Sequence, residues 1–79
     1  MTDKPESDLA MAARHATEGR RIVAQQRERI ARLKADGHPT ADHEQTLRVL
    51  ESTLQILEDH ERQIAYDMRD AWFNDWPAR

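Results

Sequence analysis

The sequence contains no cysteine, and among its 79 residues only two are glycine, three are proline and four are aromatic. The absence of cysteine excludes a disulfide framework and any thiolate metal site. No apolar run approaches the roughly 18 residues that a membrane span requires. The first residues, MTDKPESDLA, include acids and no uninterrupted apolar stretch, which argues against a secretory signal peptide. We therefore expect a cytoplasmic protein without a membrane-spanning segment.

Apolar residues are also scarce in this chain. They make up 38% of the residues, charged residues make up 34%, and the formal net charge is −3. A chain this short and this polar forms one small domain, residues 1–79, and cannot enclose a deep active-site cleft. The negative charge gives no general attraction to nucleic acid or anionic lipid. The composition instead favours long helices that bury one narrow stripe.

The one internal break is the stretch DGHPT at positions 36–40. Gly37 suits the left-handed position that ends many helices, because it has no Cβ to clash there. Pro39 cannot extend a helix, and it biases His38 toward an extended backbone. Thr40 can begin the next helix, with its hydroxyl accepting from a backbone N–H two or three residues later.

Stop and start signals this close together predict an all-α, coiled-coil-like antiparallel hairpin. We expect a first helix over about 5–36, a turn at 37–40, a second helix over about 41–73 and a short C-terminal tail.

Apolar residues recur at steps of three and four on both sides of the break, which is the spacing of a helix face. The stripe of the second half is leucine-rich, whereas the first half is thinner and includes Ala12, Ala16 and Gly19. These small residues would let the helices approach closely. The residues that we expect to pack together are Val23, Ile30, Leu33, Leu47, Leu50, Leu54, Leu57 and Ile64.

Charge supports the same pairing of the two halves. Between positions 18 and 34 six residues are basic and two are acidic, whereas between 37 and 79 nine are acidic and four are basic. A basic helix beside an acidic one favours the hairpin and opposes the pairing of like helices.

Some apolar residues lie outside the main stripe. Val49 and Ile56 are seven residues apart in the second half, and Ile22 precedes Val23 in the first. One partner helix cannot cover these residues, and two helices alone bury little apolar surface. We therefore expect two hairpins to dimerise into a four-helix bundle, with Val49 and Ile56 as candidate partner surface. The alternative is a monomer with scattered exposed apolar residues, which are normal on protein surfaces.

The four aromatic residues, Tyr66, Trp72, Phe73 and Trp76, fall within eleven positions. One interpretation is that these rings close the open end of the bundle beside the N-terminus. The other is that Trp72, Phe73 and Trp76 dock a partner, because aromatic side chains are favoured interface anchors. The sequence favours the first, since an uncovered aromatic cluster promotes aggregation.

The residues that could carry chemistry form no recognisable site. His38 and His43 flank the turn, but no two histidines lie one helical turn apart beside a third ligand, so we expect no metal. His15 and His60 should face each other across the hairpin, where one could hydrogen-bond a neighbouring acid, Glu18 or Glu61. No nucleophile–base constellation and no glycine-rich phosphate loop occurs. We expect no enzyme, no cofactor and no small-molecule substrate.

The runner-up function is a regulator that binds nucleic acid through the Arg20–Arg32 face. A basic helix with interleaved apolar residues can lie along phosphates. We rank this function second because the arginines have acidic neighbours, for example Glu28 beside Arg32, and because the net charge is negative.

A Leu-x-x-x-Gly-His motif ends the first half, and a threonine opens the second. The run from 15 to 64 thereby resembles a group of short bacterial helical-hairpin proteins with no assigned activity. The resemblance implies an architecture and no site residues. The matching residues are Leu33, Gly37, His38, Thr40, Leu47, Leu50, Leu54, His60 and Ile64. We predict a small protein–protein interaction module that associates first with itself.

Overall fold

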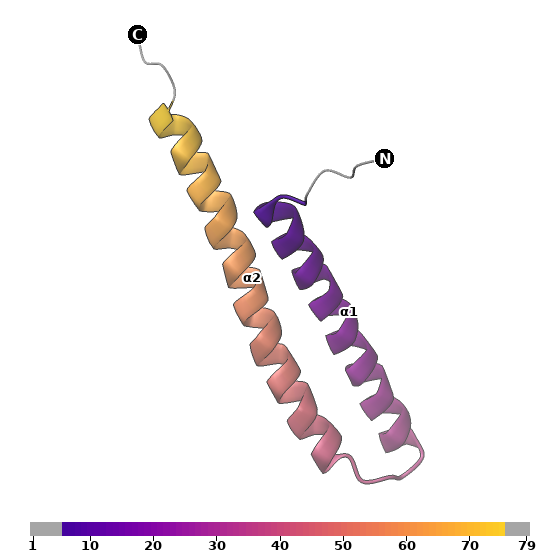
Figure 1. Cartoon of the computed structure of the whole chain (residues 1–79). Coiled ribbons are helices and arrows are strands. Elements are labelled where there is room, and N and C mark those ends of the chain that lie inside the picture. Colours follow the sequence, from indigo (N-terminus) through magenta and orange to yellow (C-terminus); the bar gives the residue numbers. More distant parts are fainter. Residues whose placement is uncertain (1–5, 76–79) are drawn as a thin grey trace, which may run out of the picture.

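The computed structural model describes residues 6–75 of the chain and the side chains up to residue 69. Helix α1 spans Asp8–Ala35 and helix α2 spans Ala41–Asp75. The two helices lie side by side and antiparallel, and α2 extends past the start of α1 at the open end (Figure 1). The predicted all-α helical hairpin is therefore confirmed. Over the described residues, neither helix contains a stretch apolar and long enough to cross a membrane.

The helix ends differ slightly from those expected. The first helix begins at Asp8 rather than near residue 5, because Ser7 has an extended backbone and caps it. The Ser7 hydroxyl accepts from the backbone N–H of Ala10 at 3.0 Å, which satisfies a donor that has no partner within the helix. The second helix continues two residues past 73, to Asp75.

The turn begins with two backbone hydrogen bonds across the end of α1. The N–H of His38 donates to the carbonyl of Leu33 at 2.9 Å, and the N–H of Gly37 donates to the carbonyl of Lys34 at 3.0 Å. Gly37 has a φ of 77°, so this is the Schellman arrangement, with glycine in the left-handed position. The predicted role of Gly37 is confirmed.

Thr40 precedes α2 as expected, but its hydroxyl acts differently. It donates to Glu44 Oε2 at 2.7 Å, whereas the sequence predicted that it would accept from a backbone amide. The reason is that an ionised carboxylate is a stronger acceptor than any neutral group nearby. This hydrogen bond, with the charge of Lys34 adding to it, holds the pKa of Glu44 below its ordinary value of 4.5.

The seam, the line along which the helices touch, is asymmetric. The side chains that α1 buries there are small or medium-sized, and they are Ala12, Ala16, Val23, Gln26 and Ile30. The leucines of α2 are only half-buried. The predicted packing residues Val23 and Ile30 are thus buried, and the half-buried ones are Leu33, Leu47, Leu50, Leu54, Leu57 and Ile64.

Two residues of α1 explain how the helices approach. A Cβ at Gly19 would lie 3.1 Å from Leu54 Cδ1 and 3.2 Å from Leu57 Cδ1, so the missing side chain makes room for both leucines. Gln26, buried in the seam, donates from Nε2 to the carbonyl of His43 at 2.9 Å. A buried amide with such a bond avoids the desolvation cost of an unpaired polar group.

Candidate interaction surface

One side of the seam is closed by ion pairs between the helices. Arg20 Nε lies 2.9 Å from Glu58 Oε2, Arg27 Nη2 lies 2.7 Å from Glu51 Oε2, and Lys34 Nζ lies 3.5 Å from Glu44 Oε1. The basic residues repeat every seven positions along α1, and the acids repeat every seven along α2. Seven residues are close to two helical turns, so each series forms a straight line facing the other. We call this side the ion-pair flank.

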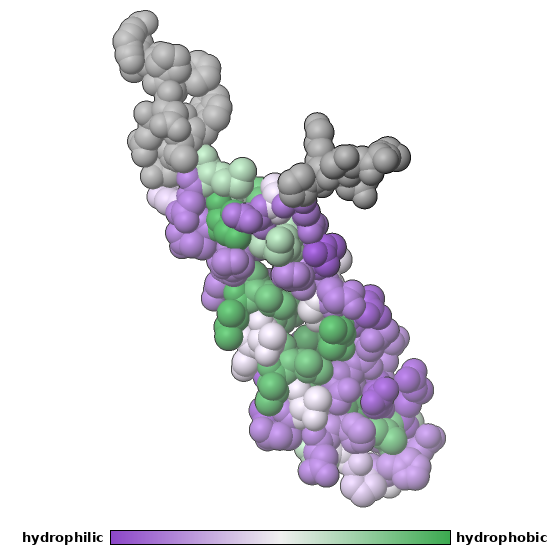
Figure 2. Space-filling view, viewed as in Figure 1, coloured by the Kyte–Doolittle hydropathy of each residue, from purple (hydrophilic) through white to green (hydrophobic). Residues whose placement is uncertain are grey.

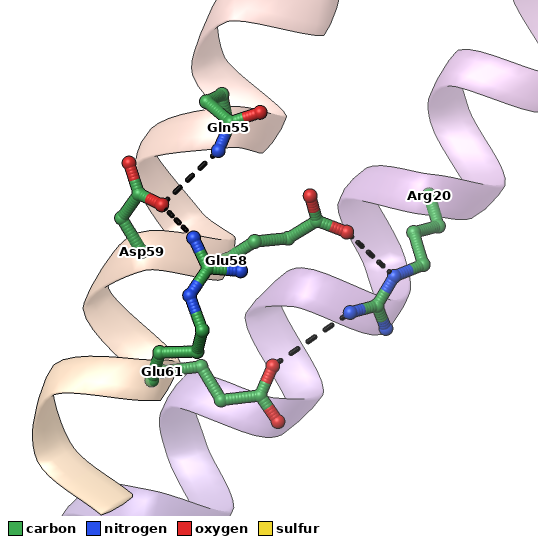
Figure 3. Close-up of polar contacts among 6 residues, drawn as sticks. Arg20, Gln55, Glu58, Asp59 and Glu61 are labelled. Atoms are coloured by element: carbon green, nitrogen blue, oxygen red, sulfur yellow. Dashed lines mark hydrogen bonds and ion pairs between the residues drawn. The ribbon is translucent and has the colours of Figure 1, made fainter. Parts of the chain in front are cut away.

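Arg20 also pairs with Glu61, the acid that interrupts the apolar stripe of α2 between Leu57 and Ile64. It points across from α1 to Glu58, and its Nη2 lies 3.7 Å from Glu61 Oε1 (Figure 3). The arginine therefore holds two acids one turn apart. The Arg20 side chain is 51% exposed and both acids are 29% exposed, so water screens these pairs and each contributes little to stability.

The ion-pair flank uses much of the basic face that the nucleic-acid alternative required. Arg20 and Arg27 bind acids of α2, and Arg21 binds Glu18 within α1. The expected pair of Glu28 with Arg32 does not form, and among the described residues neither Arg29 nor Arg32 makes an ion pair. Both arginines are exposed. Two cations without partners thus remain near the turn end of α1.

The other side of the seam, the groove flank, carries an open apolar groove with a volume of about 330 Å³. Gly19 and Ile22 border it from α1, and Leu54 and Leu57 border it from α2. The two flanks lie on opposite sides because Ile22 comes one residue before the seam residue Val23, whereas Arg27 comes four residues after it. Figure 2 shows apolar side chains gathered along the middle of both helices, with hydrophilic ones around them.

An apolar ridge runs along α2 beside the groove. Its two residues, Val49 and Ile56, are 56% and 67% exposed, and they are seven positions apart on one line of the helix. On α1, Ile22 is 37% exposed and Met11 is 38% exposed. The structure thus places the predicted partner-surface residues Val49 and Ile56 on the surface, next to a groove that the sequence did not predict.

Of the four aromatic side chains, the structure describes only that of Tyr66. Tyr66 is 68% exposed. The side chains of Trp72 and Phe73, as well as Trp76 as a whole, lie outside the described part of the chain. The two interpretations of the aromatic cluster therefore concern side chains outside the described part of the chain.

The acids expected beside the histidines are paired with arginines instead. His15 borders the groove, but its expected acidic partners are bound by arginines. Glu18 accepts from Arg21 Nε at 3.0 Å, which holds the pKa of Glu18 below its ordinary value, and Glu61 lies beside Arg20. Across the described residues, no three histidine, cysteine, aspartate or glutamate side chains come together where they could hold a metal ion.

Sequence reasoning missed both the ion-pair line and the groove. The line was visible as basic residues and acids at seven-residue steps, but the sequence analysis compared only the total charge of each half. The groove had no sequence signal of its own, because it depends on Gly19 lying opposite two leucines. Comparison of the chain with protein-family models, curated proteins and solved structures finds no match, so the geometry of the hairpin carries the functional argument.

Proposed function

We propose that this protein is a protein–protein association module whose first partner is a second copy of itself. Two hairpins pack through their groove flanks into a four-helix bundle. The observation that carries the proposal is the one-sided distribution of exposed apolar side chains. Val49 and Ile56 are more than half exposed on the side that carries the apolar groove, whereas the ion pairs between the helices occupy the opposite side.

The small core of the hairpin supports self-association. The buried apolar residues of the described chain are Ala12, Ala16, Val23 and Ile30, and two of these are alanines. Fully burying an exposed Val or Ile side chain stabilises a structure by about 1.5–3 kcal/mol. Covering the ridge and the groove in a dimer would therefore add apolar burial that one hairpin cannot supply.

The ion pairs indicate which flank remains on the outside of the bundle. Arg20, Arg27 and Lys34 are all more than half exposed. Removing such charges from water costs free energy that their pairing recovers only with excellent geometry. Packing through the groove flank leaves these charges hydrated and buries the side that has few of them.

The test is the mass of the protein in solution. Sedimentation equilibrium at tens of micromolar should give twice the mass of the chain. The double substitution Val49→Asp with Ile56→Asp should give the mass of one chain, because four charges would otherwise be buried in each dimer. Circular dichroism checks that the variant remains helical.

A matched control uses two other exposed residues of α2 that are also seven positions apart, Gln45 and Ser52. They lie outside the ridge and the groove, so Gln45→Asp with Ser52→Asp should leave the dimer intact. Wild-type protein that keeps the mass of one chain at 100 µM would refute the proposal.

Nucleic-acid binding stays the alternative, but the paired arginines do not favour it. A complex held by Arg29 and Arg32 would make few phosphate contacts. Its affinity would then depend only weakly on salt, because that dependence scales with the number of phosphates neutralised. A gel shift that weakens only slightly with salt and disappears in Arg29→Ala with Arg32→Ala would favour this alternative.

A further inference from the structure

We infer that the two copies are related by a two-fold axis parallel to the helices, so that Ile56 of each copy enters the groove of the other and both turns lie at the same end. The inference rests on the proposed self-association and specifies its geometry. It follows from where the ridge, the groove and the unpaired charges lie on one helix face.

The ridge and the groove lie on opposite sides of one line along α2. Thr46, Thr53 and His60 form this line, since they are seven positions apart and exposed, and Thr53 borders the groove. The ridge lies on the outer side of the line. The groove lies on the side toward α1. A half-turn about an axis along the line exchanges these sides and places each ridge over the partner's groove.

The other possible two-fold axis runs across the helices. A half-turn about that axis keeps the ridge on the outer side, so ridge would meet ridge and the grooves would remain open. An interface between identical chains is most complementary when each copy inserts its ridge into the partner's groove and receives the partner's ridge in its own groove. The axis parallel to the helices is the one that satisfies this condition here.

The positions of the ridge and the groove along α2 also agree with an axis parallel to the helices. The groove is bordered by α2 residues between Leu50 and Leu57, and the ridge residues are Val49 and Ile56. Rotation about an axis parallel to the helix does not shift a residue along it. Each ridge residue therefore arrives at the height of the partner's groove, where Leu54 and Leu57 pack against Gly19 of α1.

Charges near the turn favour the same arrangement. The ridge line continues seven residues before Val49 to Asp42, and the groove border continues seven residues after Ile22 to Arg29. Neither Asp42 nor Arg29 has an ion pair among the described residues. With both turns at one end, Arg29 of each copy lies at the same end of the bundle as the partner's Asp42, and the opposite charges attract. With the turns at opposite ends, Arg29 and the partner's Asp42 would lie at opposite ends of the bundle, and this attraction would be lost.

The test uses the absence of cysteine from the chain. Thr46→Cys, Thr53→Cys and His60→Cys are made one at a time and oxidised mildly, with Gln45→Cys as the control on the outer face. If the axis is parallel to the helices, each of the three residues lies beside the same residue of the partner copy. All three variants should therefore form disulfide-linked dimers. Disulfides need Cα atoms about 4.4–6.8 Å apart.

With the turns at opposite ends, only the position nearest the axis would cross-link, because residues 46 and 60 are about 21 Å apart along the helix. A protein that sediments as a dimer but cross-links at only one of the three positions overturns the inference alone. A protein that sediments as one chain and cross-links at none overturns the proposed function as well.

A charge exchange tests the predicted contact at the turn end. Arg29→Glu and Asp42→Arg should each raise the dissociation constant of the dimer by roughly tenfold, because each change removes two symmetry-related attractions between exposed charges. The double variant restores opposite charges across the interface and should regain most of the wild-type affinity. A double variant as weak as the two single changes combined would contradict the contact.

Discussion

The two flanks of the hairpin are built from the same helices and the same seven-residue spacing, but they present opposite kinds of surface. On the ion-pair flank, Arg27 and Lys34 bind Glu51 and Glu44 within the chain. On the groove flank, residues such as Ile56 have no apolar partner to cover them. The difference arises because the residues beside the seam are charged on the ion-pair flank and apolar on the groove flank. It separates the flank with ion pairs between the helices from the flank that we propose binds a second copy of the chain.

The flanks also differ in how much free energy they can supply. An exposed ion pair contributes about 0.2–1 kcal/mol, whereas burying one large apolar side chain contributes about 1.5–3 kcal/mol. The charges therefore select which residues of α1 and α2 face each other, and they add little to stability. The apolar side carries most of the energy that remains available for association.

The largest expected effect separates the seam from the groove flank. Ile30 is 7% exposed and Ile56 is 67% exposed. Ile30→Ala should lower the free energy of unfolding by about 2–4 kcal/mol, because it leaves a cavity in the seam. Ile56→Ala should change it by less than about 0.5 kcal/mol, as expected for an exposed site.

Urea denaturation at a concentration where the chain is monomeric measures both changes. If the Ile30→Ala variant has already lost its helices in the absence of urea, that result also counts as the larger destabilisation of the two. Equal costs for the two substitutions would show that Ile56 already packs within one hairpin, and the contrast between seam and groove flank would fail.

A medium effect is expected at the turn, which sets the register of both flanks at once. Gly37→Ala should cost about 1–2 kcal/mol, because an L-residue is strained at a φ of 77°. No atom lies within 4 Å of the position where the Cβ would be, so a clash with neighbours does not contribute. Gly37→Asn should cost less, since asparagine tolerates the left-handed region better.

Thermal denaturation of these two variants under the same conditions measures the difference. The dimer that remains folded should dissociate with the wild-type constant, because neither flank changes. A neutral Gly37→Ala, or one that alters dimer affinity as strongly as stability, would contradict this account of the turn.

The smallest effect is expected on the ion-pair flank. A double-mutant cycle with Arg27→Ala and Glu51→Ala should give a coupling energy of about 0.2–1 kcal/mol, because the two side chains are 61% and 40% exposed. The coupling should shrink in 1 M salt, which screens exposed charges. Urea denaturation at low and high salt measures it, and a larger coupling that salt does not reduce would mean that this flank is better shielded from water than its exposure indicates.

The hairpin could be predicted from the sequence because its signals are local. Gly37 and Pro39 interrupt the helical spacing once, and the apolar steps continue on both sides. Val23 and Ile30 were correctly placed in the core by the same spacing. The start of α1 was placed too early, because Ser7 was not considered as the cap of the helix.

The candidate surface was predicted only in part. Val49 and Ile56 were identified because they lie outside the main apolar stripe, and this follows from their spacing along the sequence. The groove beside them requires knowing that Gly19 lies opposite Leu54 and Leu57, and this depends on the register between two distant segments. The direction of the Thr40 hydroxyl likewise depended on where the Glu44 carboxylate came to rest.

The sequence alone determined the two helices, the single reversal at Gly37 and the stripe that each helix would bury, because each of these follows from residues within one or two turns of one another. The tertiary structure decided which charges pair, which leucines meet the bare backbone of Gly19, and therefore which flank stays open. These features depend on the register of α1 against α2. A shift by one turn would keep every helix and every stripe, but it would give each side chain a different neighbour.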